Sequence, residues 1–175
     1  MRILLERDDI NPNAADKCGR TSLSWAAGYG YEEIVRMLLE RNDVGPNIAD
    51  EDGQTPLSWA AKHGCEEVVR MLLERNDVDP DTIDRYGRTP ISWAATYGHG
   101  EIVELLLERN DVNPNTDDGD DRTPLSRAAG YGHAGVVRMP QDQNELILDI
   151  DEYLLRISFE ASELSEPPSK RTRRS

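Results

Sequence analysis

Cysteine and long apolar runs are scarce in this chain of 175 residues, and each shortage excludes a class of protein. The two cysteines, Cys18 and Cys65, cannot build the disulfide framework of a small secreted domain, and they suit a reducing compartment. The opening MRILLERDD has too short an apolar run for a signal peptide. No stretch approaches the roughly 18 apolar residues of a membrane helix. We therefore expect a cytoplasmic protein without a membrane partner.

Positive charge is also in short supply, because 20 Lys and Arg residues face 34 Asp and Glu residues, a net charge of −14. The last ten residues hold one glutamate and four Lys or Arg residues, so the preceding body is more acidic than the whole. An acidic body disfavours nucleic acid and favours a basic protein partner. A second interpretation, in which the charge only keeps the protein soluble, stays open.

Residues arranged for catalysis or metal binding are missing as well. His63, His99 and His133 have no cysteine or carboxylate set at ligand spacing. The acidic run Asp111–Asp121 lacks the glycine and glutamate that a calcium-binding loop needs. The chain has no phosphate-cradling glycine loop and no nucleophile elbow. We therefore predict no catalytic residue, no metal site and no cofactor, and we do not expect an enzyme.

What the chain does contain is one phrase that returns at a fixed interval. Thr21, Thr55, Thr89 and Thr123 each open a version of TPLSWAA, and successive versions are 34 residues apart. A fixed period of about 20 to 50 residues is typical of one small unit stacked on itself, a solenoid with a continuous core. Such a protein usually works through its surface and not through a catalytic pocket.

The first half of each repeat predicts a short helix. Thr55 is suited to cap the helix N-terminus, because its side-chain oxygen can accept a free backbone N–H of the first turn. Pro56 fits the first helical position, where its missing N–H costs nothing. The pair His63-Gly64 is expected to end this helix.

The second half predicts another helix and a connection. Glu66 and Glu67 suit the positive end of a helix dipole, and the apolar residues from Val68 to Leu73 suit its buried side. Asn76 is predicted to end this helix in a left-handed conformation. The Asp-rich segment Asp77–Arg88 is then an extended connection that contains turns.

Two short helices and a projecting loop every 34 residues resemble the ankyrin repeat. The resemblance covers residues 1 to about 139 and rests on Thr55-Pro56-Leu57, Ala60-Ala61, Gly64, Val68, Leu72-Leu73 and the Asp84 to Gly87 turn. It implies an all-α fold, an ankyrin-repeat solenoid of stacked helix-turn-helix units with projecting hairpin-like loops. The wording TPLSWAA followed by LLERNDV is most similar to ankyrin arrays of filamentous fungal proteins.

Two departures from the family pattern predict local differences. Serine stands where the family usually has a histidine that bonds between repeats, so we expect that tie to be weaker; the positions are Ser24, Ser58, Ser92 and Ser126. Asp121 replaces the turn glycine of the other copies, and aspartate tolerates a positive φ less well than glycine. The fourth loop is therefore expected to be reshaped.

The repeat divides the chain into seven segments. Residues 1–20 form a partial repeat, 21–54, 55–88 and 89–122 are full repeats, and 123–139 form a second partial repeat. Pro140 should stop the last helix, since proline inside a helix costs about 3 kcal/mol. Segment 140–165 is predicted to be a capping helix, with a strand at Leu146–Ile150 as the alternative, and 166–175 a disordered basic tail. The partial repeats suggest a piece of a longer array.

Positions where the copies differ are the candidates for partner binding. In ankyrin-like folds the matching positions form loop tips and the concave face that usually contact partners. The alternative is drift at exposed positions, because exposed loops vary for either reason. The candidates are Lys17, Arg20, Glu51, Asp52, Gln54, Lys62, His63, Arg85, Tyr86, Arg88, Thr96, Tyr97 and Arg122.

The tryptophan column, formed by Trp25, Trp59 and Trp93, has two interpretations. It could grip a partner, since tryptophan is a frequent interface anchor, or it could fill the seam between repeats. We favour packing. Arg127 breaks this column in the fourth copy and is expected to stack on Trp93.

Together these features favour a non-catalytic protein–protein interaction module, which we expect to be a monomer. One alternative is a nuclear regulatory factor that uses the basic cluster Ser169–Arg174, which leaves a nuclear location open. A second alternative is a truncated fragment of a larger signalling protein with no function of its own.

Overall fold

The computed structural model describes residues 10–138 as stacked helix pairs joined by projecting loops. The chain divides into two units, Met1–Met139 and Pro140–Ser175, and the described residues belong to the first. The predicted capping helix, its strand alternative and the basic tail lie outside the described residues. The helices are α2 (Ser22–Gly28), α3 (Glu32–Leu39), α4 (Pro56–His63), α5 (Glu66–Leu73), α6 (Pro90–Tyr97), α7 (Gly100–Leu107), α8 (Pro124–Gly130) and α9 (Ala134–Val137).

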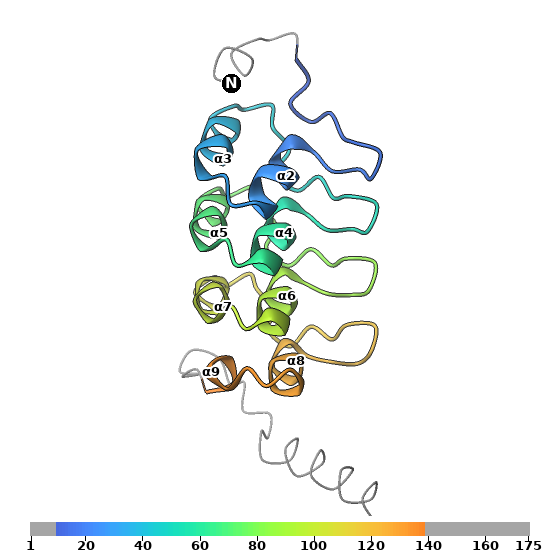
Figure 1. The fold of residues 1–175 in the computed structure, drawn as a ribbon, viewed down its shortest axis with the longest axis vertical. Helices are drawn as coiled ribbons and strands as arrows, with labels where there is room; N and C mark the ends of the chain where they lie inside the picture. The colour runs from blue at the N-terminus through green and yellow to red at the C-terminus, as the bar shows by residue number, and fades with distance from the viewer. Residues whose placement is uncertain (1–9, 139–175) are drawn as a thin grey trace, which may run out of the picture. The chain divides into compact units, whose positions relative to one another are not determined.

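The helices form two rows, which Figure 1 shows as adjacent columns with the loops projecting on one side. We call α2, α4, α6 and α8 the first-helix row, and α3, α5, α7 and α9 the second-helix row. Each helix packs on its neighbours within its row and on its own partner in the other row. Between 10 and 138 the only β pairing is an isolated bridge between Ala15 and Thr21. The predicted all-α architecture is confirmed.

The first helix of each repeat begins and ends as its sequence predicts. Thr55 Oγ1 accepts the backbone N–H of Ser58, and Pro56 occupies the first turn of α4. Gly64 ends α4 in the left-handed region, with φ of 73°. The same cap opens α2, α6 and α8. Because each cap satisfies an N–H that would otherwise be unpaired, it contributes about 1 kcal/mol to its helix.

The second helix begins as predicted but ends differently. Asn76 was expected to be left-handed, yet Asp121 is the single non-glycine residue with positive φ in the described part of the chain. The Asn76 prediction is therefore wrong. An arginine of the following repeat instead meets the last carbonyl of α3 and of α5: Arg75 Nη1 donates to Leu39 O at the end of α3 over 3.0 Å, and Arg109 Nη1 donates to Leu73 O at the end of α5 over 2.9 Å. Asp77 holds the Arg75 guanidinium through two hydrogen bonds.

The core is a continuous strip between the two rows. Alanine pairs of the first helices, such as Ala60-Ala61, are fully buried, and their small side chains let neighbouring helices approach closely. Large apolar residues recur at equivalent positions and are 0–1% exposed: Leu23, Leu57 and Ile91 in the first row, and Leu38, Leu72 and Leu106 in the second. Burial of one such side chain contributes about 1.5–3 kcal/mol.

One aspartate organises each projecting loop. In the second loop Asp50 Oδ1 accepts the backbone N–H groups of Asp52 and Gln54, over 3.0 and 2.9 Å. Asp16, Asp84 and Asp118 make the same pair of bonds in their own loops. Adjacent loops are joined through their backbones, because the N–H of Arg85 donates to the carbonyl of Asp52 over 2.8 Å. The loops therefore form one continuous hydrogen-bonded array.

The fourth loop keeps this shape, so the prediction that it is reshaped is wrong. Asp121 has the expected positive φ of 56°, and its N–H donates to Asp118 O over 3.0 Å, as Gly53 does to Asp50 over 2.9 Å. A Cβ at Gly53 would lie 3.0 Å from the Arg85 nitrogen of the next loop. Since no later loop follows within residues 10–138, a side chain is tolerated at Asp121.

The serine column bonds within its own repeat. Ser58 is fully buried, and its Oγ lies 3.1 Å from Thr55 Oγ1. A different column ties the first helices together. His99 Nε2 lies 3.3 Å from the Lys62 carbonyl, and His133 Nε2 lies 2.9 Å from the Thr96 carbonyl. These histidines thus take part in inter-repeat contacts from the turn between the two helices.

Candidate functional site

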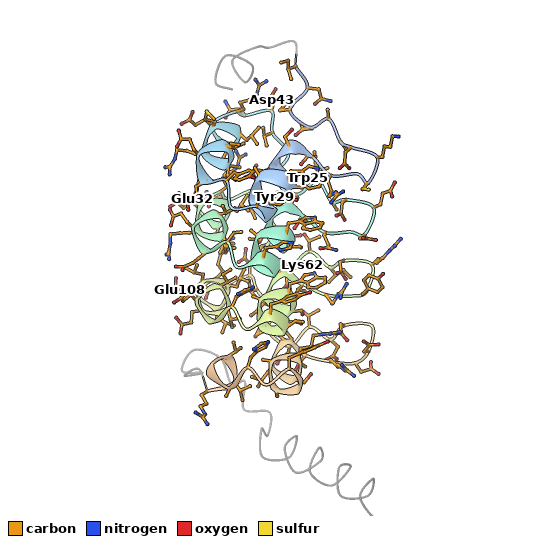
Figure 2. All side chains as sticks on the ribbon, in the orientation of Figure 1. Trp25, Tyr29, Glu32, Asp43, Lys62 and Glu108 are labelled. Atoms are coloured by element: carbon orange, nitrogen blue, oxygen red, sulfur yellow. The ribbon has the colours of Figure 1, made fainter. Side chains whose placement is uncertain are left out.

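The candidate residues fall into two groups. At the loop tips Lys17, Glu51, Arg85 and Tyr86 are exposed. Asp52 and Arg85 neutralise each other across adjacent loops, with Oδ1 and Nη1 2.8 Å apart. The second group lies on the first-helix row and at the base of the loops: Arg20, Gln54, Lys62, His63, Arg88, Thr96, Tyr97 and Arg122. Figure 2 shows Lys62 further along the same row that holds Trp25 and Tyr29.

The tryptophan column lies among the second group. Exposure falls along the stack, from 37% at Trp25 through a half-buried Trp59 to 4% at Trp93. The packing interpretation therefore fits Trp93, whereas Trp25 offers a free surface. Each indole stacks on the ring four residues later, and Trp25 and Tyr29 have centroids 5.6 Å apart. This stacking gives the first-helix row a surface of layered rings.

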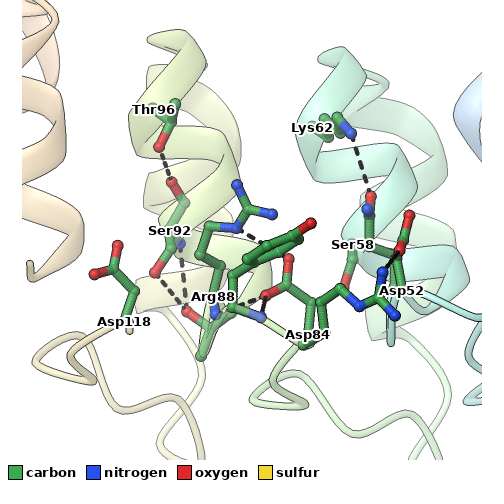
Figure 3. A network of polar contacts seen from close by, with 12 residues as sticks. Asp52, Ser58, Lys62, Asp84, Arg88, Ser92, Thr96 and Asp118 are labelled. Atoms are coloured by element: carbon green, nitrogen blue, oxygen red, sulfur yellow. Dashed lines mark hydrogen bonds and ion pairs between the residues drawn. The ribbon is translucent and has the colours of Figure 1, made fainter. Parts of the chain in front are cut away.

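The indole N–H groups connect these rings to the loops. Trp25 Nε1 donates to Asp16 Oδ2, and Trp59 Nε1 donates to Asp50 Oδ2, each over 3.0 Å. In the third repeat the corresponding oxygen, Asp84 Oδ2, accepts a hydrogen bond from Arg88 Nε over 3.0 Å. Figure 3 shows Arg88 and Asp84 side by side there. The aspartate that shapes each of these loops thus also orients an indole or a guanidinium next to it.

Cationic side chains lie over the faces of the three indole rings. The guanidinium carbon of Arg20 is 3.9 Å from the Trp25 ring centroid, and that of Arg88 is 3.8 Å from Trp93. Lys62 Nζ lies between two indoles, 4.9 Å from Trp59 and 4.3 Å from Trp93. A cation within about 6 Å of a ring centroid is attracted by the negative face of the ring. The indoles and cations therefore alternate along the stack.

Gln54 and Gly28 explain which residue supplies the cation. Gln54 occupies the position of Arg20 and Arg88 but is neutral and 4% exposed. Its Oε1 lies 3.4 Å from Lys62 Nζ, so it contacts the cation of the face from a buried position. Gly28 stands where the next repeat has Lys62 and has no charge to offer. The cation between Trp25 and Trp59 is therefore Arg20, whose guanidinium carbon is 5.7 Å from the Trp59 ring centroid. Each gap between indoles contains one cation, from either of two columns.

The glycine leaves a cavity of about 230 Å³ between the first two indoles. A Cβ at Gly28 would lie 3.4 Å from the Trp59 ring, so the missing side chain keeps this gap open. The cavity is lined by Arg20, Ser24, Trp25, Gly28, Tyr29, Trp59 and His63. It offers flat apolar walls beside a guanidinium.

Arg127 does not stack on Trp93, and that prediction is wrong. It is 7% exposed and forms an ion pair with Asp118, with Asp120 at 3.5 Å from its Nη2. Arg127 therefore replaces the indole as a donor to the loop aspartate. The side chains that lie over Trp93 are Arg88 and Lys62.

The titration of the face reflects its burial and its positive charge. Burial lowers the pKa of Lys62, and the charge of Arg88 lowers it further, while nearby aspartates oppose the shift. Burial also lowers the pKa of His63, and the neighbouring Lys62 and His99 act in the same direction. Positive charges are thus held together here in a partly desolvated setting.

Charge is separated between the two rows. Apart from Glu51 at a loop tip, the glutamates between 10 and 138 lie on or directly after the second helices: Glu32, Glu33, Glu40, Glu66, Glu67, Glu74, Glu101, Glu104 and Glu108. Figure 2 shows Glu32 and Glu108 on that row, away from Lys62.

We define the indole face as four columns of the first-helix row and the loop bases: Arg20, Gln54, Arg88, Arg122; Trp25, Trp59, Trp93, Arg127; Gly28, Lys62, Thr96, Gly130; and Tyr29, His63, Tyr97, Tyr131. None of these positions holds an aspartate or glutamate.

Between 10 and 138, no three His, Cys, Asp or Glu side chains are grouped so that they could hold a metal ion. No helix described here is long and apolar enough to cross a bilayer. Cys18 and Cys65 are free thiols, and burial raises the pKa of Cys65.

Comparison with known families identifies the repeat. A family model described as ankyrin repeats, in three copies, matches residues 1–84 and 76–139. A search of curated proteins finds no match. The matched residues form most of the chain and include every helix described above. The geometry of capped first helices, antiparallel second helices and projecting loops agrees with that match, and the chain belongs to the ankyrin-repeat family.

Proposed function

We propose that this chain is a non-catalytic protein–protein interaction module that contacts its partner through the indole face and the loop tips. Ankyrin repeats are in general protein-interaction modules. The observation that carries the proposal is the indole face itself, where half-exposed rings and cations form a layered surface that the stack does not cover. Aromatic rings and arginine are the side chains most enriched at binding hot spots.

The two rows suit partners of different charge. The net charge of −14 favours a basic partner, and the glutamates that would attract it lie on the second-helix row. The indole face presents the opposite charge. We propose that binding uses the indole face, and that the module acts as a monomer in the cytoplasm, with a nuclear location as the alternative.

Affinity capture with matched charge reversals tests this proposal. The tagged full chain, a Lys62→Glu variant and an Arg70→Glu variant are used to capture proteins from the native cell, which are identified by mass spectrometry. Arg70 is exposed on α5 of the second-helix row, so both variants make the same change in charge on different rows. We expect Lys62→Glu to lose proteins that Arg70→Glu retains. Equal retention by both variants, at unchanged melting temperature, would rule out the indole face.

A further inference from the structure

The cations of the indole face have hydrogen-bond donors that the described fold does not use. The Arg20 guanidinium donates no hydrogen bond within 10–138, and its buried Nε has no partner of good geometry, although Asp16 lies 3.4 Å away. Arg88 donates from Nε alone, to Asp84. Lys62 Nζ has one partner there, the neutral Gln54. All three can donate further hydrogen bonds to a ligand.

Partial burial strengthens what these donors offer. The side chains of Arg20 and Arg88 are 24% and 18% exposed, and each rests on an indole. An indole behind a cation removes water from one side and gives no hydrogen bond in return. A carboxylate that arrives from the open side replaces lost water and adds a charge-assisted hydrogen bond, which is stronger than a neutral one.

The neighbouring residues favour an anion over a cation. An incoming lysine or arginine would meet Lys62, Arg20 and Arg88, and the carboxylates of Asp16 and Asp84 beside them are already paired with Arg20 and Arg88. The ring surfaces that could attract it are already covered by those cations. The glutamates lie on the second-helix row, and at physiological salt charges more than about 8 Å apart are largely screened from each other.

We propose that the indole face docks an acidic, extended segment of a partner protein. Its carboxylates pair with Arg20, Lys62 and Arg88, which follow one another along the stack, and one apolar side chain enters the cavity between Trp25 and Trp59. The cavity fits this role because its walls are indole rings and Gly28 leaves it open beside the Arg20 guanidinium. This inference rests on the proposed function and adds the chemistry of the partner.

Single-stranded nucleic acid is the other anion that aromatic rings commonly bind, and it fits less well. Bases bind by stacking on free ring faces. Here each tryptophan stacks on a tyrosine or histidine of its own helix and carries a cation.

Tryptophan fluorescence of the full chain tests the proposal, because its three tryptophans all lie on this face. The probes are a 12-residue peptide of alternating Glu and Gly with a central Leu, the same peptide with Lys in place of Glu, and a dT12 oligonucleotide, all at physiological salt. We expect a saturable change in emission with the Glu peptide. Lys62→Gln should weaken its binding threefold to tenfold, and Arg70→Gln should change it less than twofold.

Filling the cavity provides a second arm. Gly28→Leu places a side chain between Trp25 and Trp59, so a Glu peptide with the central Leu should no longer bind more tightly than one without it. The inference is overturned if the Glu peptide gives no saturable change, if the Lys peptide or dT12 binds more tightly, or if both glutamine variants lose affinity equally. A captured partner that depends on Lys62 but contacts it through a basic segment would overturn this inference and leave the proposed function standing.

Discussion

At the scale of single residues, Asp81 is the least satisfied side chain of the loops. Asn13 and Asn47 hold the equivalent positions, and their amide nitrogens donate to the carbonyls of Asp43 and Asp77 over 2.7 and 2.6 Å. A carboxylate cannot make this donation. Asp81 Oδ1 is buried without a hydrogen-bond partner, and burial raises the pKa of this carboxyl. The folded state therefore favours protonated Asp81.

We expect Asp81→Asn to stabilise the protein by about 1 kcal/mol at pH 7, because the amide restores the missing hydrogen bond. The folded pKa of Asp81 is raised, so its ionised form penalises folding once the pH rises above the unfolded value. The advantage of asparagine should therefore grow as the pH rises from 3 to 7. Urea unfolding at both pH values measures it. The reverse change, Asn47→Asp, should destabilise at pH 7, and a gain in stability from it would contradict this explanation.

The tryptophans should differ in what they contribute to stability. Trp93 is 4% exposed, so Trp93→Ala should cost about 3 kcal/mol through the cavity it leaves. Trp25 is 37% exposed, and Trp25→Ala should cost less than about 1 kcal/mol. Thermal unfolding of the two variants checks the order. Equal losses would mean that the column has a single structural role and that Trp25 is not free for a partner.

At the scale of secondary-structure elements, the loops require glycine only where another loop follows. Gly53 combines a φ of 81° with a Cβ position 3.0 Å from the Arg85 nitrogen. Gly53→Ala should therefore cost more than about 1 kcal/mol. Asp121→Gly should stabilise by about 1 kcal/mol, since it removes the cost of a positive φ without any steric relief. The midpoints of denaturant unfolding measure both changes in stability. A destabilised Asp121→Gly variant would show that the aspartate side chain is needed.

The sequence predicted the elements that depend on neighbours along the chain. The Thr55-Pro56 start and the Gly64 end of α4 follow from capping rules within one repeat. The wrong predictions concern residues whose position depends on contacts outside their own helix. The end of α5 is met by Arg109 of the next repeat, which donates to the carbonyl of Leu73, and not by Asn76. Arg127 pairs with Asp118 and not with Trp93, because the loop folds back over its own helix.

The candidate site was predicted in part. Comparison of the copies selected Lys62 and Arg88, which lie on the indole face, but it also selected Gln54, which is buried. The open gap between Trp25 and Trp59 could have been suspected from Gly28 alone, since it stands in the column of Lys62. Its importance becomes visible only when Lys62 is seen between two indoles.

At the scale of the whole molecule, the net charge conceals the distribution of charge. The value of −14 comes with most glutamates on the second-helix row, while the four columns of the indole face hold cations and no Asp or Glu residue, and two of their arginines pair with loop aspartates. A partner's charge therefore cannot be inferred from the sum. The stack presents two surfaces of different character, and we propose that the partner binds the one with aromatic rings.

Hydrogen exchange of the chain with and without its captured partner tests this placement most directly. We predict that the partner slows exchange at backbone N–H groups of the first-helix row and the loop bases, around Arg20, Lys62 and Arg88, and leaves the N–H groups of α3, α5 and α7 unchanged. Slower exchange confined to α3, α5 and α7 would contradict it, because the partner would then be bound to the acidic row.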